Sequence, residues 1–502
     1  MRVPLLRYTS ERPKPQNDSV IRRKEAAMLL SDILKEKSGK FADLEITGVT
    51  CDSRQVVKGS VFVCIDGAIQ DGHKYAKAAY DSGAAVIVCE KDTGLDNQIF
   101  VEDSRKEYAK MSANWFSNPA KNLKIIGVTG TNGKTSVSYM IKEILETCGH
   151  KVGLVGTIQN MIGDEILPSK NTTPSCYELQ SMFSLMVAAG CDYCVMEVSS
   201  HALDQDRVYG IEFEAGLFTN LTQDHLDYHI TMENYLKAKK RLFNSSKIAV
   251  MNCDDSYFAE MVKELEQKTV TFSAMGNNAD YNAENIVLKP DGSEFDLVSK
   301  NGYNHIKTAI GGKFTPYNAM CAAVCLIELG FDAKAVCDAF SKMSGIKGRA
   351  EVVPCGRDFT VIIDYAHTPD GLENILKTFS ECEKNRLIVL FGCGGDRDRT
   401  KRPKMGAIAA SLADYVIVTS DNPRSEEPIS IINDILEGMK DSTAPYEVIE
   451  NRVEAIKKAV QIAKKGDIIV LAGKGHETYQ ILKSGTIHLD EREVVAEALK
   501  EL

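Results

Sequence analysis

Long apolar runs are missing from this 502-residue sequence. The longest, GAAVIVC at 83–89 and GDIIVLAG at 466–473, have the length of a β-strand, whereas a membrane-spanning helix needs roughly 20 apolar residues. The N-terminal stretch is basic, but it has neither an extended apolar core nor a small-residue cleavage site. It therefore predicts an irregular extension over residues 1–25 and no secretory signal. We expect no membrane partner.

A regular cysteine spacing is also missing. The 14 cysteines are scattered along the chain, and CDYC at 191–194 lacks the second pair that would complete a structural zinc site. Because CDYC lies in an alternating apolar run, we interpret it as strand core. Free thiols in a chain of this size indicate a reducing, cytoplasmic environment.

Basic residues are in the minority. The sequence has 60 Lys and Arg against 70 Asp and Glu, a net charge of −10. This balance argues against nucleic acid as the main partner, although local basic patches can still bind small anions. No repeat of solenoid period is present either.

What the sequence does contain is a regular alternation of strands and helices. Residues 26–38 predict an amphipathic helix, and NWFSNPAKNLK at 114–124 interrupts the pattern like a linker. Apolar strands interleaved with helical stretches run from 124 to about 345 and again from 358, a pattern typical of parallel sheets covered by helices on both faces. We predict an α/β protein in which residues 1–25 are the extension and three domains span 26–118, 119–348 and 349–502. The central sheet is expected to be mostly parallel and the last domain Rossmann-like.

The stretch IIGVTGTNGKTSVSYMIKEIL at 125–145 combines a strand, a glycine-rich turn and an amphipathic helix. Val128 stands where the strict P-loop pattern has its first glycine, but Gly130 and Gly133 still let backbone N–H groups turn toward phosphate oxygens. Lys134 supplies a cation for the β- and γ-phosphates, and the Thr135 hydroxyl can ligate magnesium. A plain strand–turn–helix would not explain these residues in this order, so we predict a phosphate-binding loop.

Carboxylates and histidines follow two further strands. Glu197 ends one of them, and Asp224, His225, Asp227 and His229 follow another. Magnesium bound with ATP needs few protein ligands, mostly oxygen atoms, because phosphates and water complete its shell. Each residue alone is typical of a structural cap. Their shared position at strand ends near the predicted phosphate loop favours a metal-binding role.

The stretch SDNPRSEEP at 420–428 stops the apolar run YVIVT abruptly. Turn chemistry accounts for Asn422 and Pro423, but not for the opposite charges of Asp421 and Arg424 at a strand end. The planar guanidinium of Arg424 can meet a carboxylate with two hydrogen bonds, while Asp421 and Asn422 can hold polar groups. The pattern raises the question of which small molecule would need both charges, and a turn stabilised by a surface ion pair is the alternative.

Many motifs occur together in one order: GVTGTNGKTS, NTTP (171–174), MEVSSHAL, TNLTQDHLDYH, AKKRLF, GRAEVV, DYAHTPDGL, FGCGGDRDRTKRP, DNPR and GKGHE. Over about residues 26–500 the sequence resembles the Mur ligases, the ATP-dependent amide-forming enzymes of peptidoglycan precursor synthesis. Within that family it resembles the members that add the third residue of the stem peptide. The resemblance implies an N-terminal domain that binds the uridine nucleotide, a central P-loop domain that binds ATP, and a C-terminal domain that brings the incoming amino acid.

The resemblance also implies substrates and the residues that hold them. The substrates would be ATP, UDP-MurNAc-L-Ala-D-Glu and meso-diaminopimelate, with Mg²⁺ as cofactor and carbon dioxide to carbamylate a lysine; we expect a cytoplasmic monomer. ATP would contact Gly130, Thr131, Asn132, Gly133, Lys134, Thr135, Ser136, Asn318 and Arg349, with Asp364 as a ribose or hinge contact. The UDP-muramoyl dipeptide would contact Ser53, Asn171, Thr172, Thr173, Ser199, Gln205 and Arg207. Diaminopimelate would contact Arg397, Asp421, Asn422, Pro423, Arg424, Gly473 and Glu477. The metal would be held by Thr135, Glu197, His225 and the carbamate of Lys239, and the catalytic residues would be Lys134, Lys239 and His225.

Several alternatives stay open. Folylpoly-γ-glutamate synthetase shares the phosphate loop and the amide chemistry, although DNPR and GKGHE argue against it. A P-loop NTPase that switches a protein partner would need no DHLDYH or AKKRLF cluster, and a purely structural protein would have no use for Lys134. L-Lysine as the added amino acid would leave Arg424 without its carboxylate, which is unfavourable for a buried arginine.

Overall fold

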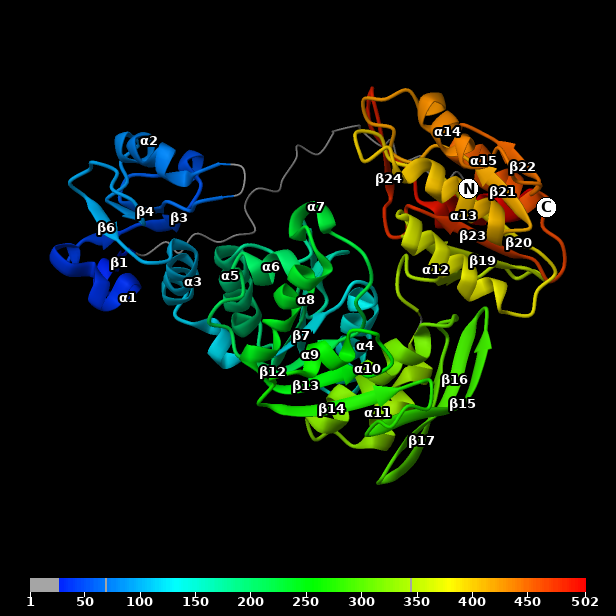
Figure 1. Ribbon diagram of the computed structural model, residues 1–502, viewed down its shortest axis with the longest axis horizontal. Helices are drawn as coiled ribbons and strands as arrows, with labels where there is room; N and C mark the ends of the chain where they lie inside the picture. The colour runs from blue at the N-terminus through cyan, green and yellow to red at the C-terminus, as the bar shows by residue number, and fades with distance from the viewer. Residues whose placement is uncertain (1–26, 68–69, 344) are drawn as a thin grey trace, which may run out of the picture. The chain divides into compact units, whose positions relative to one another are not determined.

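The computed structural model describes residues 27–67, 70–343 and 345–502 (Figure 1). The expected extension over residues 1–25 lies outside them. The chain forms two compact units. The first runs up to Ile125 and includes Lys151–Cys194 and Val198–Glu212, and the second contains Ile126–His150, Val195–Glu197 and Phe213–Leu502.

The first unit begins with a parallel four-stranded sheet in the order β3-β4-β5-β6. Alternate residues of its strands face opposite sides, as a pleated strand requires. Val61 and Val86 pack in one cluster with α1 and α3, and Phe62 and Ile87 pack in another with α2. The elements are β1 (Met28–Leu29), α1 (Leu30–Leu34), β2 (Glu45–Ile46), β3 (Gly48–Thr50), β4 (Ser60–Val63), α2 (Ala76–Asp81), β5 (Val86–Cys89), β6 (Gln98–Phe100) and α3 (Ser104–Trp115).

Two local predictions for this unit need correction. The helix expected over 26–38 is only the short α1, because Met28 and Leu29 form strand β1 and Lys35 takes a positive φ angle (52°) that ends the helix after Leu34. A 3₁₀ segment follows, with a kink at Gly39 (φ 51°). The stretch expected to be a linker starts inside α3, whose last residue, Trp115, is buried. A turn and a short 3₁₀ helix (Pro119–Asn122) then lead into the next strand.

The first unit also contains an antiparallel meander and two helices: β8 (Val152–Val155), β9 (Asn160–Ile162), β10 (Glu165–Leu167), α5 (Cys176–Ala188) and α6 (Ser200–Asp204). Helix α5 begins with a capping box, in which Ser175 accepts from the N–H of Glu178 and the Glu178 carboxylate accepts from the N–H of Ser175. Ser199 caps α6 in a similar way, by accepting from the N–H of Ala202.

The second unit contains two sheets. In the first, β7 (Lys124–Thr129), β12 (Phe213–Phe218), β13 (Ser246–Asn252), β14 (Lys268–Ser273) and β15 (Tyr281–Lys289) are parallel neighbours in that order, and β16 (Gly292–Ser299) and β17 (Gly302–Thr308) extend it antiparallel. Strand β11 (Tyr193–Glu197) is next to β7 in the strand order and brings Glu197 into this unit. The helices are α4 (Lys134–Thr147), α7 (Leu226–His229), α8 (Met232–Lys240), α9 (Phe258–Val262), α10 (Thr315–Glu328) and α11 (Ala333–Ala339).

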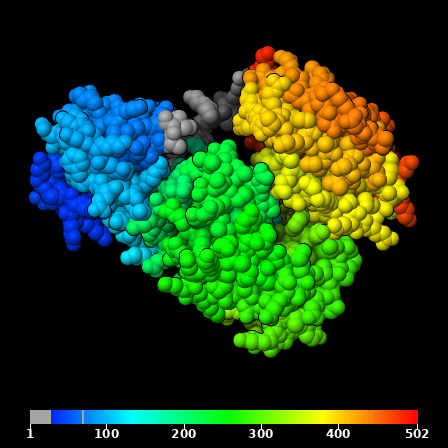
Figure 2. Space-filling view, viewed as in Figure 1, coloured from blue at the N-terminus to red at the C-terminus, as the bar shows by residue number. Residues whose placement is uncertain are grey.

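The second sheet of this unit has the order β18-β19-β23-β20-β21-β22 and is parallel except for β18. Val389 faces a core built with α12, α13 and α14, whose outer surface is yellow to orange in Figure 2, and Leu390 faces a core built with α15 and α16. The elements are β18 (Glu351–Val353), β19 (Thr360–Asp364), α12 (Pro369–Ser380), β20 (Leu387–Phe391), α13 (Lys401–Leu412), β21 (Tyr415–Val418), α14 (Pro428–Glu437), β22 (Tyr446–Val448), α15 (Arg452–Gln461), β23 (Ile468–Ala472), β24 (Tyr479–Leu482), β25 (Gly485–His488) and α16 (Glu491–Lys500). The predicted α/β class with parallel sheets covered by helices is confirmed.

A fully enclosed ion pair ties the last helix to the ends of two parallel strands. Arg452 and Glu491 are both inaccessible to solvent and lie 2.8 Å apart. The same guanidinium donates to the carbonyl oxygens of Ser420, just after β21, and Ala472, at the end of β23. These two strand ends lead directly into the DNPR and GKGHE motifs.

Candidate active site

The phosphate loop has the conformation that its glycines predict. Gly130 has φ 151°, and a Cβ atom there would lie 1.9 Å from Oγ1 of Thr219. Gly133 has φ 85°, and its Cβ would lie 2.5 Å from Oδ1 of Asn318. Both positions therefore exclude side chains, and the loop opens directly into helix α4, whose N-terminus attracts anions.

Two lysine side chains converge on one carbonyl oxygen of this loop. Lys134 Nζ and Lys239 Nζ each lie 2.8 Å from the carbonyl oxygen of Gly130, and Lys134 also donates to Thr131 O at 2.9 Å. Burial, and then the charge of Lys134, hold the pKa of Lys239 well below its ordinary value. Burial also lowers the pKa of Lys134, while the carboxylates of Glu197 and Asp224 oppose that shift. The site therefore favours a neutral amine at Lys239.

Thr135 and Glu197 supply the oxygen atoms expected for magnesium. Both are buried, and Thr135 Oγ1 donates to Glu197 Oε1 at 3.0 Å. His225 is nearly half exposed, with Nε2 3.4 Å from Asp224 Oδ2, and its pKa is lowered by partial burial against the pull of that carboxylate. No three His, Cys, Asp or Glu side chains among residues 27–67, 70–343 and 345–502 form a metal site by themselves. A threonine and a glutamate fit a Mg²⁺ ion that takes its other ligands from phosphate and water.

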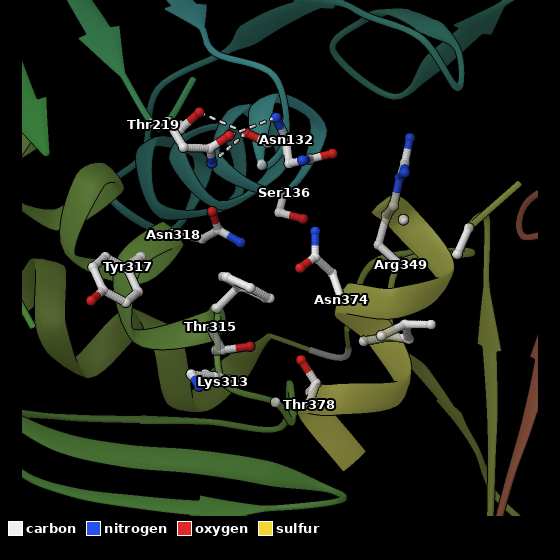
Figure 3. Close-up of a pocket in the computed structure, with 18 of the residues that line it drawn as sticks. Asn132, Ser136, Thr219, Lys313, Thr315, Tyr317, Asn318, Arg349, Asn374 and Thr378 are labelled. Atoms are coloured by element: carbon white, nitrogen blue, oxygen red, sulfur yellow. Dashed lines mark hydrogen bonds between the residues drawn. The ribbon is translucent and has the colours of Figure 1, made fainter. Parts of the chain in front are cut away.

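A cavity of about 420 Å³ adjoins the phosphate loop, a volume typical of small-molecule sites. Figure 3 shows Ser136, Asn318 and Asn374 around the same space, and Thr315 and Thr378 line it further on. Asn132 and Arg349 also line this cavity. The structure thus brings five of the residues expected for ATP to one cavity: Asn132, Gly133, Ser136, Asn318 and Arg349.

Arg349 and Asp364 lie where the last sheet begins. Arg349 Nη2 lies 3.4 Å from Thr135 Oγ1, and its guanidinium stacks over the ring of Tyr365 at 5.1 Å. Asp364 accepts from the N–H groups of Ala350 and Ala366, and burial raises the pKa of its carboxyl group, against the charge of Arg349. The Nε atom of Arg349 is buried without a hydrogen-bond partner, which leaves one donor available beside the cavity.

A second group of polar side chains gathers at the carboxyl ends of β21 and β23. Asp421 and Asn422 are buried there, and Asn422 Nδ2 donates to Glu477 Oε2 at 2.9 Å. Gly473, with φ 113°, is required because a Cβ atom would come within 2.9 Å of Asp421 Oδ2. The centre of this group is Lys474, which sequence reasoning did not identify. GKGHE contained it, but two of its three partners, Asp421 and Asn422, are more than 50 residues away in the sequence.

Arg424 borders this group in a strained backbone conformation. Its φ is 54°, uncommon for a residue with a side chain, and its Nη1 donates to Gly395 O at 2.9 Å. Pro423 packs so closely that a Cβ at Gly395 would lie 1.9 Å from its carbonyl oxygen. Arg397 is exposed. A Cβ atom at Gly394 would lie 2.9 Å from Arg424 Nη1 and 3.8 Å from Arg397 Cγ. The side chains of both arginines therefore lie beside Gly394.

The residues expected for the uridine-linked substrate lie in the first unit. Thr173 Oγ1 lies 3.3 Å from Ser199 Oγ and accepts from its N–H. Arg207 donates to Thr173 O at 2.8 Å and to Gln205 Oε1 at 2.7 Å, so these four residues form one group. Thr172 Oγ1 lies 3.0 Å from the hydroxyl of Thr157, and Asn171, beside it, is exposed. Ser53 begins a 3₁₀ helix after β3, beside the capping residue Asp52.

The interpretation of CDYC as core is confirmed, because Cys191 and Cys194 are both buried, the latter within β11. In the part of the chain that the structure describes, no helix has both the length and the apolarity needed to cross a bilayer.

Comparison with known proteins identifies the family. The Mur ligase family, catalytic domain matches residues 45–126, the Mur ligase middle domain matches 128–326, and the Mur ligase, glutamate ligase domain matches 348–475. The chain therefore belongs to the Mur ligase family of ATP-dependent, amide-forming ligases.

Individual relatives carry more specific names. A Clostridium botulinum protein named UDP-N-acetylmuramoyl-L-alanyl-D-glutamate–2,6-diaminopimelate ligase is 52% identical over 469 residues, which are 91% of this chain and 96% of that protein. A solved structure of a ligase with the same name gives a TM-score of 0.72 at 35% identity, over 95% of this chain and 99% of that one. A folylpolyglutamate synthase from Mycobacterium tuberculosis, complexed with ADP and AMPPCP, gives 0.58 at 18% identity over 72% and 91%, and so shares the fold alone.

Proposed function

We propose that this ligase joins meso-diaminopimelate to the γ-carboxylate of D-glutamate in UDP-MurNAc-L-Ala-D-Glu, with conversion of ATP to ADP and phosphate, in peptidoglycan precursor synthesis. The observation that carries the proposal is the position of Arg424 beside the Asp421, Asn422 and Glu477 group at the ends of parallel strands, where its Nη1 lies 3.4 Å from the carbonyl oxygen of Asn422. An arginine beside an anionic group suits an amino acid whose far end is a zwitterion. The name of the relative that is 52% identical supports the same substrate.

We propose the domain division already predicted from the sequence: a UDP-binding domain at 26–118, an ATP-binding domain at 119–348 and an amino-acid-binding domain at 349–502. The three matched family segments, which begin at residues 45, 128 and 348, support it. ATP would lie in the cavity, with its phosphates in the loop from Gly130 to Ser136.

Thr135 and Glu197 would hold magnesium, with His225 and a carbamate on Lys239 as further contacts. When bound with ATP, Mg²⁺ neutralises charge on the triphosphate. The support for carbamylation is the burial of Lys239, which lowers the pKa of its amine and so favours the neutral form; a neutral amine can react with carbon dioxide whereas an ammonium cannot. The carbamate would turn a cationic position into an anionic one.

The UDP-muramoyl dipeptide and meso-diaminopimelate would bind to two of the groups described above. Thr173, Ser199, Gln205 and Arg207, with Ser53, Asn171 and Thr172, would hold the UDP-muramoyl dipeptide. The DNPR segment (421–424), with Arg397, Gly473 and Glu477, would hold meso-diaminopimelate. We further propose a monomer that works in the cytoplasm on small molecules only. Buried free thiols such as those of Cys321, Cys325 and Cys337 support a reducing compartment.

In the proposed reaction, the γ-carboxylate of D-glutamate attacks the γ-phosphorus of ATP, releases ADP and becomes an acyl phosphate. The amine of diaminopimelate, in its neutral form, then attacks the acyl carbon, and phosphate leaves. Lys134 would neutralise negative charge as it moves between the β- and γ-phosphates. The other residues mainly position the reactants, which lowers the entropic part of the barrier.

Phosphate release by the purified chain tests this proposal. With ATP, Mg²⁺ and UDP-MurNAc-L-Ala-D-Glu present, we expect meso-diaminopimelate to stimulate release strongly and L-lysine to do so poorly. Stimulation by L-lysine alone would reverse the specificity, and stimulation by folate substrates would assign the chain to the folylpolyglutamate branch. No release with the complete mixture would reject the proposed function.

A further inference from the structure

Lys474 is an unusual residue because it is charged and wholly enclosed. Its side chain has no solvent-accessible surface, whereas lysine is almost never fully buried unless it is paired. An ammonium group has three hydrogens to donate. Three acceptors surround this one: Glu477 Oε2 at 2.9 Å, Asn422 Oδ1 at 3.0 Å and Asp421 Oδ1 at 3.4 Å. The contacts leave no donor of Lys474 unused.

The three partners come from segments that are far apart in the sequence. Asp421 and Asn422 follow β21, while Glu477 lies three residues beyond Lys474, after β23. Asn422 Nδ2 closes the ring by donating to the same Glu477 oxygen that Lys474 contacts. The hairpin of β24 and β25 supports the group from another side, because Gln480 donates to Asp421 O and the N–H of Ile481 donates to Asn422 Oδ1.

The group formed by Lys474, Asp421, Asn422 and Glu477 carries a net negative charge. Two carboxylates and one ammonium leave one unit of negative charge, which matches one cationic group of a ligand. Without the lysine, the carboxylates of Asp421 and Glu477 would repel each other with no cation between them, and repulsion would displace one of them. A displaced Glu477 could not receive an ammonium group in a fixed geometry.

We infer that Lys474 is a positioning residue of the amino-acid site: its ammonium group fixes Glu477, Asp421 and Asn422 so that the Glu477 carboxylate receives an ammonium group of the incoming diamino acid. This inference rests on the proposed function and adds a residue to it. Lys474 itself does not touch the substrate. It acts through Glu477, so replacing Lys474 should change the same kinetic constant as replacing Glu477, namely the KM for meso-diaminopimelate.

A double-mutant cycle measures that dependence. Steady-state phosphate release is recorded for the full-length wild type, Lys474→Met, Glu477→Gln and the double variant, with meso-diaminopimelate and ATP varied in turn. We expect each single change to raise the KM for meso-diaminopimelate about tenfold or more, since each removes a charge-assisted hydrogen bond, with the KM for ATP changed less than about threefold. The double variant should have the KM of the worse single variant and not the product of the two effects.

Lys483→Met is the matched control, because Lys483 follows β24 in the same region but is exposed and pairs only with the exposed Glu427 at 3.1 Å. It should leave both KM values unchanged. Multiplicative effects in the double variant, or a KM for meso-diaminopimelate that Lys474→Met does not change, would overturn the inference.

Folding is checked by thermal unfolding of every variant. If Lys474→Met is unfolded at the assay temperature, the double variant, which removes one charge of each sign, is compared with Glu477→Gln alone. Equal KM values for meso-diaminopimelate support the inference, and a tenfold higher value in the double variant rejects it. Absence of diaminopimelate-dependent release in the wild type would instead reject the proposed function, so the two failures are distinguishable.

Discussion

Arg402 and Glu426 connect the two loops that carry Arg397 and Arg424 in the proposed amino-acid site. Arg402 is fully enclosed, and its Nη2 lies 2.8 Å from Glu426 Oε1, while its Nη1 lies 2.9 Å from Asp434 Oδ2. Glu426 in turn accepts from the N–H of Asp396, and Asp396 accepts from the hydroxyl of Ser425. Asp396 and Arg424 have φ angles of 53° and 54°. Arg402 therefore anchors two strained turns, which carry Arg397 and Arg424.

Replacing Arg402 should destabilise the chain and weaken amino-acid binding together. Arg402→Met leaves the partly exposed carboxylates of Glu426 and Asp434 without their shared cation, and loss of hydrogen bonds to charged groups costs about 1.5–3 kcal/mol. Urea unfolding would measure the loss, and the KM for meso-diaminopimelate should rise. Arg399→Met is the control, because Arg399 contacts the same Asp434 from an exposed position and should cost less than about 0.5 kcal/mol. Equal losses in the two variants would contradict this anchoring role.

The same ion pair predicts how stability depends on pH. Hydrogen bonds from Arg402 lower the pKa of Glu426 to about 2, below the value of about 4.3 expected in the unfolded chain. A depressed carboxyl pKa stabilises the fold above the unfolded value, and this contribution is lost as pH falls toward 2. The difference in unfolding free energy between wild type and Arg402→Met should therefore shrink between pH 5 and pH 3. If the difference in unfolding free energy stayed constant over this pH range, the interaction with Arg402 would not be the cause of a low pKa at Glu426.

Arg424→Ala should impair use of meso-diaminopimelate and spare ATP. Loss of hydrogen bonds to a charged carboxylate should raise the KM for the amino acid about 10- to 100-fold. Arg424→Lys should recover little, because an ammonium group cannot form two parallel hydrogen bonds. Initial rates of phosphate release at varied amino-acid concentration would measure both variants, and an unchanged KM would remove Arg424 from the site.

Gly130→Ala should disrupt nucleotide binding. The added Cβ would collide with Thr219 at a distance of 1.9 Å, so the loop must move away from its anion-binding conformation. We expect at least about a tenfold loss of affinity for ATP by calorimetry. Gly149, just after the far end of α4, also has a positive φ (89°) but no atom within 4 Å of a new Cβ, so Gly149→Ala should affect stability without affecting the affinity for ATP.

Ile230→Gly should stabilise the protein. Ile230 is β-branched, has φ 69° and is 76% exposed, so its strain is not offset by burial. Relief of strain of about 1–3 kcal/mol, less about 0.5–1 kcal/mol for the flexibility of glycine, predicts a net gain of about 1 kcal/mol in thermal or urea unfolding. Ile166→Gly, at an exposed position within β10, should be destabilising. A loss of stability in Ile230→Gly would show that the side chain makes a compensating contribution.

The sequence predicts the parts of the site that are encoded locally. GVTGTNGKTS specifies a strand, a turn and a helix within a short segment, and β7 and α4 follow it closely. The strands before DNPR and GKGHE are continuous apolar runs, as expected for parallel strands buried on both faces. Their polar ends were therefore recognisable as ligand positions.

The remaining features depend on contacts between distant residues. Lys474 reads as an ordinary lysine in a glycine-rich turn until Asp421 and Asn422, more than 50 positions earlier, are brought beside it. The helix expected over 26–38 has suitable periodicity, but a positive φ angle at Lys35 ends it early while Leu30, Ile33 and Leu34 still reach the core. Periodicity reports which residues are buried more reliably than where a helix ends.

The pairing of Arg452 with Glu491 has a consequence for how the chain matures on the ribosome. The guanidinium that supports Ser420 and Ala472 has no carboxylate partner of its own until Glu491 has left the exit tunnel. Glu491 must therefore have emerged before its pairing with Arg452 can fix the strand ends that lead into DNPR and GKGHE. A nascent chain halted before residue 491 should bind nucleotide yet fail to capture the incoming amino acid.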